Sequence, residues 1–155
     1  MNSRIFGLQI KVSVSIWFIV VIPLVIMYGY LVQYLVALVS IIFHEIGHAL
    51  VAAYFRAYPF FVKITPLGLR ILIREDHLFK KQKLAVDLAG PAVNLFLTGM
   101  LYAIISISLM EGTYFTGSDI DFLENALAIN ICLAVFNLFP IPPLDGGRTL
   151  QNILS

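Results

Sequence analysis

The sequence is short of charged residues. Asp, Glu, Lys and Arg make up only 12% of its 155 residues, and the formal net charge is +1. Soluble domains carry about 25% charged residues, which they need to cover their surface with polar groups. Intrinsic disorder is excluded as well, because it requires low hydrophobicity, whereas 60% of this chain is hydrophobic. The composition therefore indicates an integral membrane protein.

Cysteine and basic residues are also scarce. Cys132 is the only cysteine in the sequence, which excludes a disulfide scaffold within the chain. Lys and Arg together number 10, too few for the basic face that binds nucleic acid. We therefore expect the lipid bilayer and proteins, but no nucleic acid, among its partners.

Long charge-free runs predict four transmembrane helices, since one span needs about 20 apolar residues. Residues 12–43 carry no charge, and apart from Glu45 the run continues to residue 55, enough for two spans with a turn around residues 28–33. Two further runs cover residues 88–110 and 125–144. We expect an all-α polytopic membrane protein, a single membrane-embedded core with spans at about residues 12–30, 34–55, 84–110 and 122–141.

The basic residues predict the orientation of these spans. All of them lie before the first span, between the second and third, or after the fourth, whereas the segment from Glu111 to Asp121 carries only acidic charges. Lys and Arg are enriched in cytoplasmic segments. We therefore expect a multi-pass protein of the cell membrane with both termini in the cytoplasm.

The segment between the second and third expected spans has the pattern of a β-strand. Apolar residues alternate there with other residues at period two, at Leu67, Leu69, Ile71 and Ile73. Pro66 and Gly68 mark a turn at the start of this stretch. We expect a short membrane-associated strand or β-hairpin.

The second expected span contains the sequence H-E-x-x-H, formed by His44, Glu45 and His48. Positions four apart share one face of a helix, so both imidazoles can bind one zinc ion while Glu45 accepts a proton from the activated water. A chance pentapeptide or a pair of packed polar residues is the alternative. We favour the zinc site, because three such polar side chains inside a span are costly without a function.

Catalytic zinc needs a third protein ligand, and Asp87 and Asp145 are the candidates within apolar sequence. Asp145 follows three prolines and precedes two glycines, residues that interrupt a helix and allow an unusual backbone. Beside an intramembrane H-E-x-x-H, we prefer Asp145 as the ligand over a solvated residue in a membrane-exit loop. Asp87 is expected to be a surface charge at the start of the third span, and His77 to be solvated in a charged loop.

Three motifs in order resemble those of the site-2 protease family of intramembrane zinc metalloproteases, peptidase family M50B. Besides the H-E-x-x-H, residues 89–94 resemble the family's A-G-P-x-x-N segment, and residues 137–147 resemble its N-x-x-P-x-x-P-L-D-G-G element. The resemblance covers nearly the whole chain. Its closest likeness within the family is to the branch of stage IV sporulation protein FB, since no segment of PDZ-domain size is present.

This resemblance implies a metalloendopeptidase with one Zn²⁺, bound by His44, His48 and Asp145, in which Glu45 activates water. It also implies that Asn94 and Asn137 hold the substrate or support the transition state, and that the strand near residues 67–73 pairs with an unwound substrate. The implied substrate is a membrane-tethered protein, in the sporulation branch the precursor of a sigma factor. Membrane-protein regulators are implied as well.

The sequence departs from that branch after Asp145, where ten residues remain. The sporulation proteases carry two further spans and a cytoplasmic nucleotide-sensing domain there, so we expect these C-terminal helices and the regulatory domain to be absent. The alternatives are a minimal active core and a truncated, inactive fragment that acts by binding partners. A small transporter with a proton relay is a third alternative, but a relay does not explain the spacing of the histidines together with Asp145.

Overall fold

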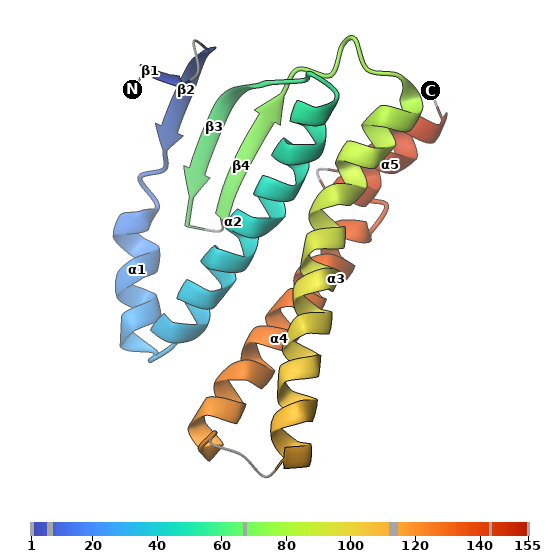
Figure 1. Ribbon diagram of the computed structural model, residues 1–155. Coiled ribbons are helices and arrows are strands. Elements are labelled where there is room, and N and C mark those ends of the chain that lie inside the picture. Colours follow the sequence, from blue (N-terminus) through green and yellow to red (C-terminus); the bar gives the residue numbers. More distant parts are fainter. Residues whose placement is uncertain (1, 6–7, 67, 112–114, 143, 155) are drawn as a thin grey trace.

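The fold consists of five helices and four strands in the part of the chain that the computed structural model describes, residues 2–5, 8–66, 68–111, 115–142 and 144–154 (Figure 1). The elements in chain order are β1 (Asn2–Ile5), β2 (Leu8–Val14), α1 (Phe18–Met27), α2 (Leu31–Tyr54), β3 (Pro59–Thr65), β4 (Gly68–Ile73), α3 (Lys80–Glu111), α4 (Gly117–Leu138) and α5 (Asp145–Leu154).

The helices pack around α3, which contacts α2, α4 and α5 (Figure 1). Among the described residues, α2 and α3 are long and apolar enough to cross a membrane, which supports the second and third predicted spans. Helix α4 occupies most of the fourth predicted span. It begins at a capping box in which Thr116 and Asp119 exchange hydrogen bonds, and these bonds lower the pKa of the Asp119 carboxyl.

The helix predicted for residues 12–30 is wrong in its extent. Residues up to Val14 belong to β2, and α1 has only 10 residues. A helix of that length covers about 15 Å, half of the roughly 30 Å of a bilayer's hydrocarbon core. The turn expected around residues 28–33 is present, because Gly29 adopts a φ of 74° between α1 and α2.

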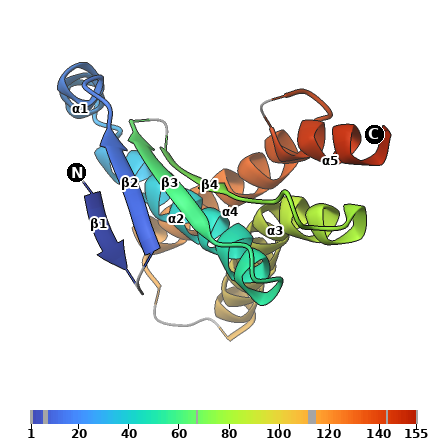
Figure 2. The ribbon, with the colours of Figure 1, turned by 90° about the horizontal axis from the view of Figure 1, so that it is seen from above.

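A four-stranded sheet adds to the expected helical fold and is larger than the short strand or hairpin predicted from the sequence. Its order is β1-β2-β3-β4, in which β2 and β3 are parallel and the other neighbours are antiparallel. The hairpin predicted between the second and third spans is confirmed as β3 and β4, although Leu67 lies outside the described residues. Seen from above, the sheet lies along one side of α2, against which β4 packs (Figure 2).

Large apolar side chains point outward over much of the helical surface. Leu50, Phe96 and Phe136 are 66%, 66% and 63% exposed, whereas the buried core is a small cluster around Ala52, Ala57, Leu78 and Val86. In water such an apolar exterior would be an aggregation or docking surface. An apolar exterior of this kind suits helices that are surrounded by lipid.

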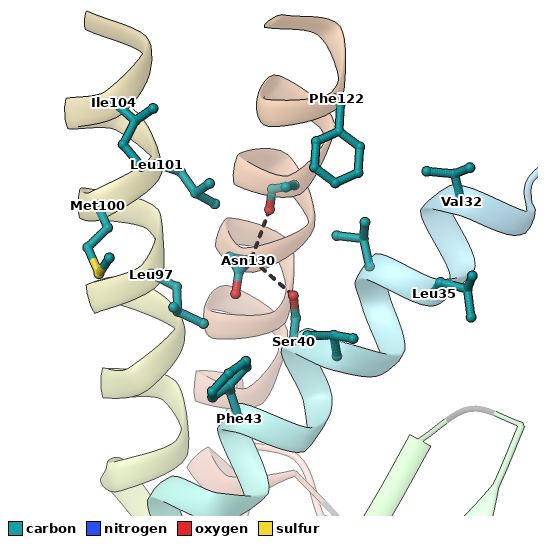
Figure 3. A pocket seen from close by; sticks show the side chains of 13 residues that line it. Val32, Leu35, Ser40, Phe43, Leu97, Met100, Leu101, Ile104, Phe122 and Asn130 are labelled. Atoms are coloured by element: carbon teal, nitrogen blue, oxygen red, sulfur yellow. Dashed lines mark hydrogen bonds between the residues drawn. The ribbon is translucent and has the colours of Figure 1, made fainter. Parts of the chain in front are cut away.

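A cavity of about 480 Å³ lies between α2, α3 and α4 (Figure 3). Its lining is apolar except for Ser40 and Asn130. The Asn130 side-chain amide donates to Ser40 Oγ at 3.1 Å and to the Ala126 carbonyl at 2.9 Å. This interhelical hydrogen bond joins α4 to α2 one helical turn before His44.

We expect the Ser40–Asn130 hydrogen bond to contribute measurably to helix association. A double-mutant cycle of Ser40→Ala and Asn130→Ala should give a coupling free energy of about 0.6 to 1.7 kcal/mol, the range of hydrogen bonds between membrane helices. The measurement is reversible unfolding in mixed micelles. A coupling indistinguishable from zero would show that the bond does not stabilise the contact of α2 with α4.

Candidate metal centre

Helix α2 places its two histidines on one buried face. His44 and His48 are four residues apart and each is 5% exposed, while Phe43 and Ile46 on other faces of the helix are exposed. The Nε2 atoms of the two rings lie 3.1 Å apart. The periodicity predicted from the sequence is therefore present, and it directs both imidazoles at the same point.

The third side chain of the group, Asp145, reaches the two histidines because the helical conformation is interrupted between α4 and α5. The helix ends at Leu138, and α5 begins at Asp145 after a segment that contains the prolines. A Cβ atom on Gly146 would overlap the Leu138 carbonyl, and one on Gly147 would lie 2.5 Å from the Ile141 carbonyl carbon. The two glycines therefore let the turn fold tightly onto the end of α4, which aims Asp145 at the histidines.

The three side chains form a nearly regular triangle of ligand atoms. Asp145 Oδ2 lies 3.0 Å from His44 Nε2 and 3.2 Å from His48 Nε2, and the third edge is the 3.1 Å between the histidines. A tetrahedral zinc ion with bonds of 2.0–2.1 Å needs ligand atoms about 3.3 Å apart. Two imidazoles and one carboxylate in this arrangement fit zinc and leave a fourth position open. Asp87, the other candidate ligand, is not part of the group.

The surroundings fix the orientation of His48. Its Nδ1 atom lies 2.6 Å from the carbonyl oxygen of Val86 in α3 and donates to it, which leaves Nε2 free to face the triangle. His44 Nδ1 is buried and has no hydrogen-bond partner among the described residues. The backbone of α3 thus acts as the outer support of one ligand.

Helix α3 approaches the ligands so closely that it needs glycine there. A Cβ atom on Gly90 would lie 2.5 Å from His44 Nε2 and would overlap His48 Nε2. On the facing helix, a Cβ atom on Gly47 would lie 2.7 Å from Val93 Cγ2. The glycine of the A-G-P-x-x-N segment therefore has a direct role in making room for the metal centre.

Glu45 lies next to the triangle and faces the sheet. Its Oε2 atom accepts a hydrogen bond of 2.8 Å from the backbone N–H of Ile71 in β4. Glu45, His48 and Asp145 share a small pocket of about 130 Å³ with residues 70–73 of β4, Val86 and Arg148. Glu45 and the edge strand β4 therefore face the same space.

The two asparagines lie outside this pocket. Asn94 is fully buried one turn after Gly90 on α3, and neither atom of its side-chain amide has a partner among the described residues. Asn137 is half-buried, and its side chain donates to the Leu133 carbonyl of its own helix at 2.9 Å. The roles implied for them in holding substrate stay predictions.

Asp87 is not the surface charge that the sequence led us to expect. It is 0% exposed, and its Oδ1 atom lies 3.2 Å from Nη2 of Arg148. Sequence reasoning missed this pair because its members belong to different helices and no local pattern connects them. His77 is exposed, as predicted.

Comparison with known proteins supports the resemblance found in the sequence. Residues 106–155, which include Asp145, match peptidase family M50. The chain is 30% identical over 160 residues to a zinc metalloprotease of Methanocaldococcus jannaschii, covering 98% of this chain and 44% of that protein. It also matches the solved structure of the site-2 protease from Methanocaldococcus jannaschii with a TM-score of 0.75 and 28% identity, over 100% of this chain and 71% of that chain. The chain is therefore similar to the zinc metalloproteases of peptidase family M50.

The resemblance to site-2 proteases is thereby confirmed. Stage IV sporulation protein FB of Bacillus subtilis is another relative, 29% identical over 150 residues, with 96% of this chain and 48% of that protein covered. The chain thus spans about half the length of the curated relatives that it matches.

We expect Gly90→Ala to disrupt metal binding. The added methyl group would occupy space now taken by both histidine Nε2 atoms, so zinc affinity should fall at least about tenfold, as for the loss of outer support of a ligand. Gly99→Ala is the matched control, because it makes the same change in α3 where a Cβ atom meets nothing within 4 Å. The measurement is competition for zinc with a chelator. Equal affinities in the two variants would contradict the assigned role of Gly90.

Proposed function

We propose that this chain carries the catalytic core of a zinc-dependent intramembrane endopeptidase that hydrolyses a peptide bond of a membrane-tethered protein. The observation that carries the proposal is the triangle of His44, His48 and Asp145 with Glu45 beside it. The relatives named as zinc metalloproteases support the same function.

A zinc ion in this triangle would acidify water and polarise the substrate carbonyl. Glu45 is the group of this chain that would accept the proton and pass it to the leaving amine. Its carboxylate is held by the Ile71 N–H at 2.8 Å, so the base has a defined position before substrate arrives. His48 is held by Val86 at the same time.

The substrate would bind as an extended segment along β4. This strand is the last in the sheet order, and residues 70–73 line the pocket that holds Glu45. An exposed sheet edge can accept an added strand through backbone hydrogen bonds, and an extended peptide presents its bond to the metal more openly than a helix does. The buried, unpartnered amide of Asn94 supports its proposed role near the site, and Asn137 remains the second candidate.

The topology that we propose keeps both termini on the cytoplasmic side of a multi-pass protein. The sheet joins β1 and β2 to the hairpin of β3 and β4, so the start of the chain lies on the same side as the segment between α2 and α3. The strands carry the basic residues Arg4, Lys11, Lys63 and Arg70, which favours the cytoplasmic face for the sheet. Cleavage would then occur near that face.

A sigma-factor precursor is the substrate that we propose for a first test. The similarity to stage IV sporulation protein FB supports it, but the archaeal metalloprotease is equally similar. A panel should therefore include other membrane-tethered segments. Membrane-protein regulators are proposed on the same family resemblance.

We expect Glu45→Gln to abolish cleavage and to keep the metal. Glutamine retains an oxygen for the Ile71 N–H but cannot accept the proton, so the cleavage rate should fall by about 10² to 10⁴-fold. Metal analysis should give about one zinc per chain in the wild type and in Glu45→Gln, and much less in Asp145→Ala.

The measurements are metal analysis and cleavage of the substrate panel in proteoliposomes. Absence of zinc from the wild type would refute the proposed function. Zinc binding without cleavage of any substrate would favour the alternative of a fragment that acts by binding partners.

We expect the Ile71 amide to matter for the reaction and not for zinc binding. Ile71→Pro removes this N–H from an edge strand, where proline is tolerated if the N–H faces outward. Loss of the position of Glu45 should lower kcat by about 10²-fold, the cost of misplacing a reacting group, with zinc affinity unchanged. Ile71→Val keeps the amide and serves as the control. Cleavage by Ile71→Pro at the wild-type rate would contradict this role.

A further inference from the structure

We propose that Asp87 and Arg148 are positioning residues of the metal centre: their buried ion pair holds α5 against α3 and so places Asp145 onto the two histidines. The proposal rests on the proposed zinc site. It assigns a role to two charged residues that neither bind the metal nor move a proton in the reaction.

Both carboxylate oxygens of Asp87 face side chains of α5. Oδ1 forms the ion pair with Arg148 Nη2 at 3.2 Å, outside the geometry of a hydrogen bond, and Oδ2 accepts a hydrogen bond of 2.7 Å from the Asn152 side chain. A charge that is 0% exposed is retained at low cost only when it is paired and hydrogen-bonded. Helix α5 supplies both kinds of contact to Asp87.

The face of α5 that carries the metal ligand also carries these two contacts. Asp145, Arg148 and Asn152 stand at positions i, i+3 and i+7, which place them along one side of a helix. The apolar side chains of Leu150 and Leu154 are 40% and 77% exposed in the described structure. Polar contacts to α3 therefore fix the rotation of α5, and this rotation decides where the Asp145 carboxylate points.

Consecutive residues of α3 thus support two different ligands. The carbonyl of Val86 holds His48 of α2, and the side chain of the next residue, Asp87, holds the helix of Asp145. A rotation of α5 relative to this turn of α3 would change the position of Asp145 Oδ2 relative to both Nε2 atoms. The spacing of the triangle is therefore set from one short stretch of α3.

Arg148 makes a second ion pair with the segment that follows the sheet. Its Nη2 atom lies 2.6 Å from Oε1 of Glu75, in the segment that follows β4. Arg148 therefore links α5 to Asp87 and to the chain beyond the edge strand. Glu75 gives Arg148 a partner when Asp87 is changed, so the effect of such a change can be read as loss of the contact between α5 and α3.

The test is zinc affinity of the whole chain in the inactive Glu45→Gln background, measured by competition with a chelator in nanodiscs. We expect Asp87→Asn and Arg148→Gln each to weaken zinc binding by about 10 to 100-fold, the usual effect of losing outer support of a metal ligand. The two changes should be non-additive in the double variant, whose loss of zinc affinity should be smaller than the product of the two single losses, because both single variants already lack the pair of Asp87 with Arg148. Arg148→Lys should restore part of the affinity.

A spectroscopic readout separates positioning from simple stabilisation. With Co²⁺ as the probe, the visible spectrum of Asp87→Asn should shift towards that of Asp145→Ala, since the Asp145 carboxylate is displaced in the first variant and absent from the second. Asp121→Asn is the matched control, because it makes the same substitution at an exposed acid on α4 and should change neither zinc affinity nor the Co²⁺ spectrum.

The inference would be overturned if Asp87→Asn and Arg148→Gln kept the wild-type zinc affinity and Co²⁺ spectrum, with or without a lower thermal stability. The proposed function would then remain intact. Failure of the Glu45→Gln background itself to bind zinc would overturn the inference together with the proposed function. The variants are compared by zinc affinity and Co²⁺ spectrum alone, so the result does not depend on cleavage activity.

Discussion

The convergence of His44, His48 and Asp145 is the interaction on which the rest of the structure depends. Asp145 follows the two histidines by 101 and 97 residues, yet the three side chains place their nearest nitrogen and oxygen atoms within 3.2 Å of one another in an apolar helical assembly. Polar groups buried in that way are costly unless they are paired or bind a metal. The non-helical segment between α4 and α5 and the close approach of α3 both make this arrangement possible.

Helix α3 is the scaffold of the centre, although it supplies no ligand. Gly90 lets its backbone approach both histidines, and the Val86 carbonyl orients one of them. On the other side of α2, the sheet brings β4 to Glu45. The histidines are thus supported from one side and Glu45 from the other, and Glu45, His48 and Asp145 face a common pocket.

Several features could be predicted because they are local. The spacing of His44 and His48 places both on one helix face whatever surrounds the helix, and the alternation at residues 69–73 already predicted β4. The first span was overestimated because an apolar run does not distinguish a membrane helix from a strand that pairs elsewhere. Val12 and Val14 belong to β2, which pairs in parallel with β3 beyond two intervening helices.

The sequence by itself determined the apolar environment, the pair of histidines with their adjacent acid, and the helix break before Asp145, since each follows from residues close together in the chain. Tertiary structure brought Asp145, the acid that the sequence already favoured, to the histidines, and it gave Asp87 a buried ion pair in place of the expected surface position. The physical reason is that the partners of both acids lie far away along the chain, so local sequence cannot place them. Only the packing of α5 on α3 directs Asp145 to the histidines and pairs Asp87 with Arg148.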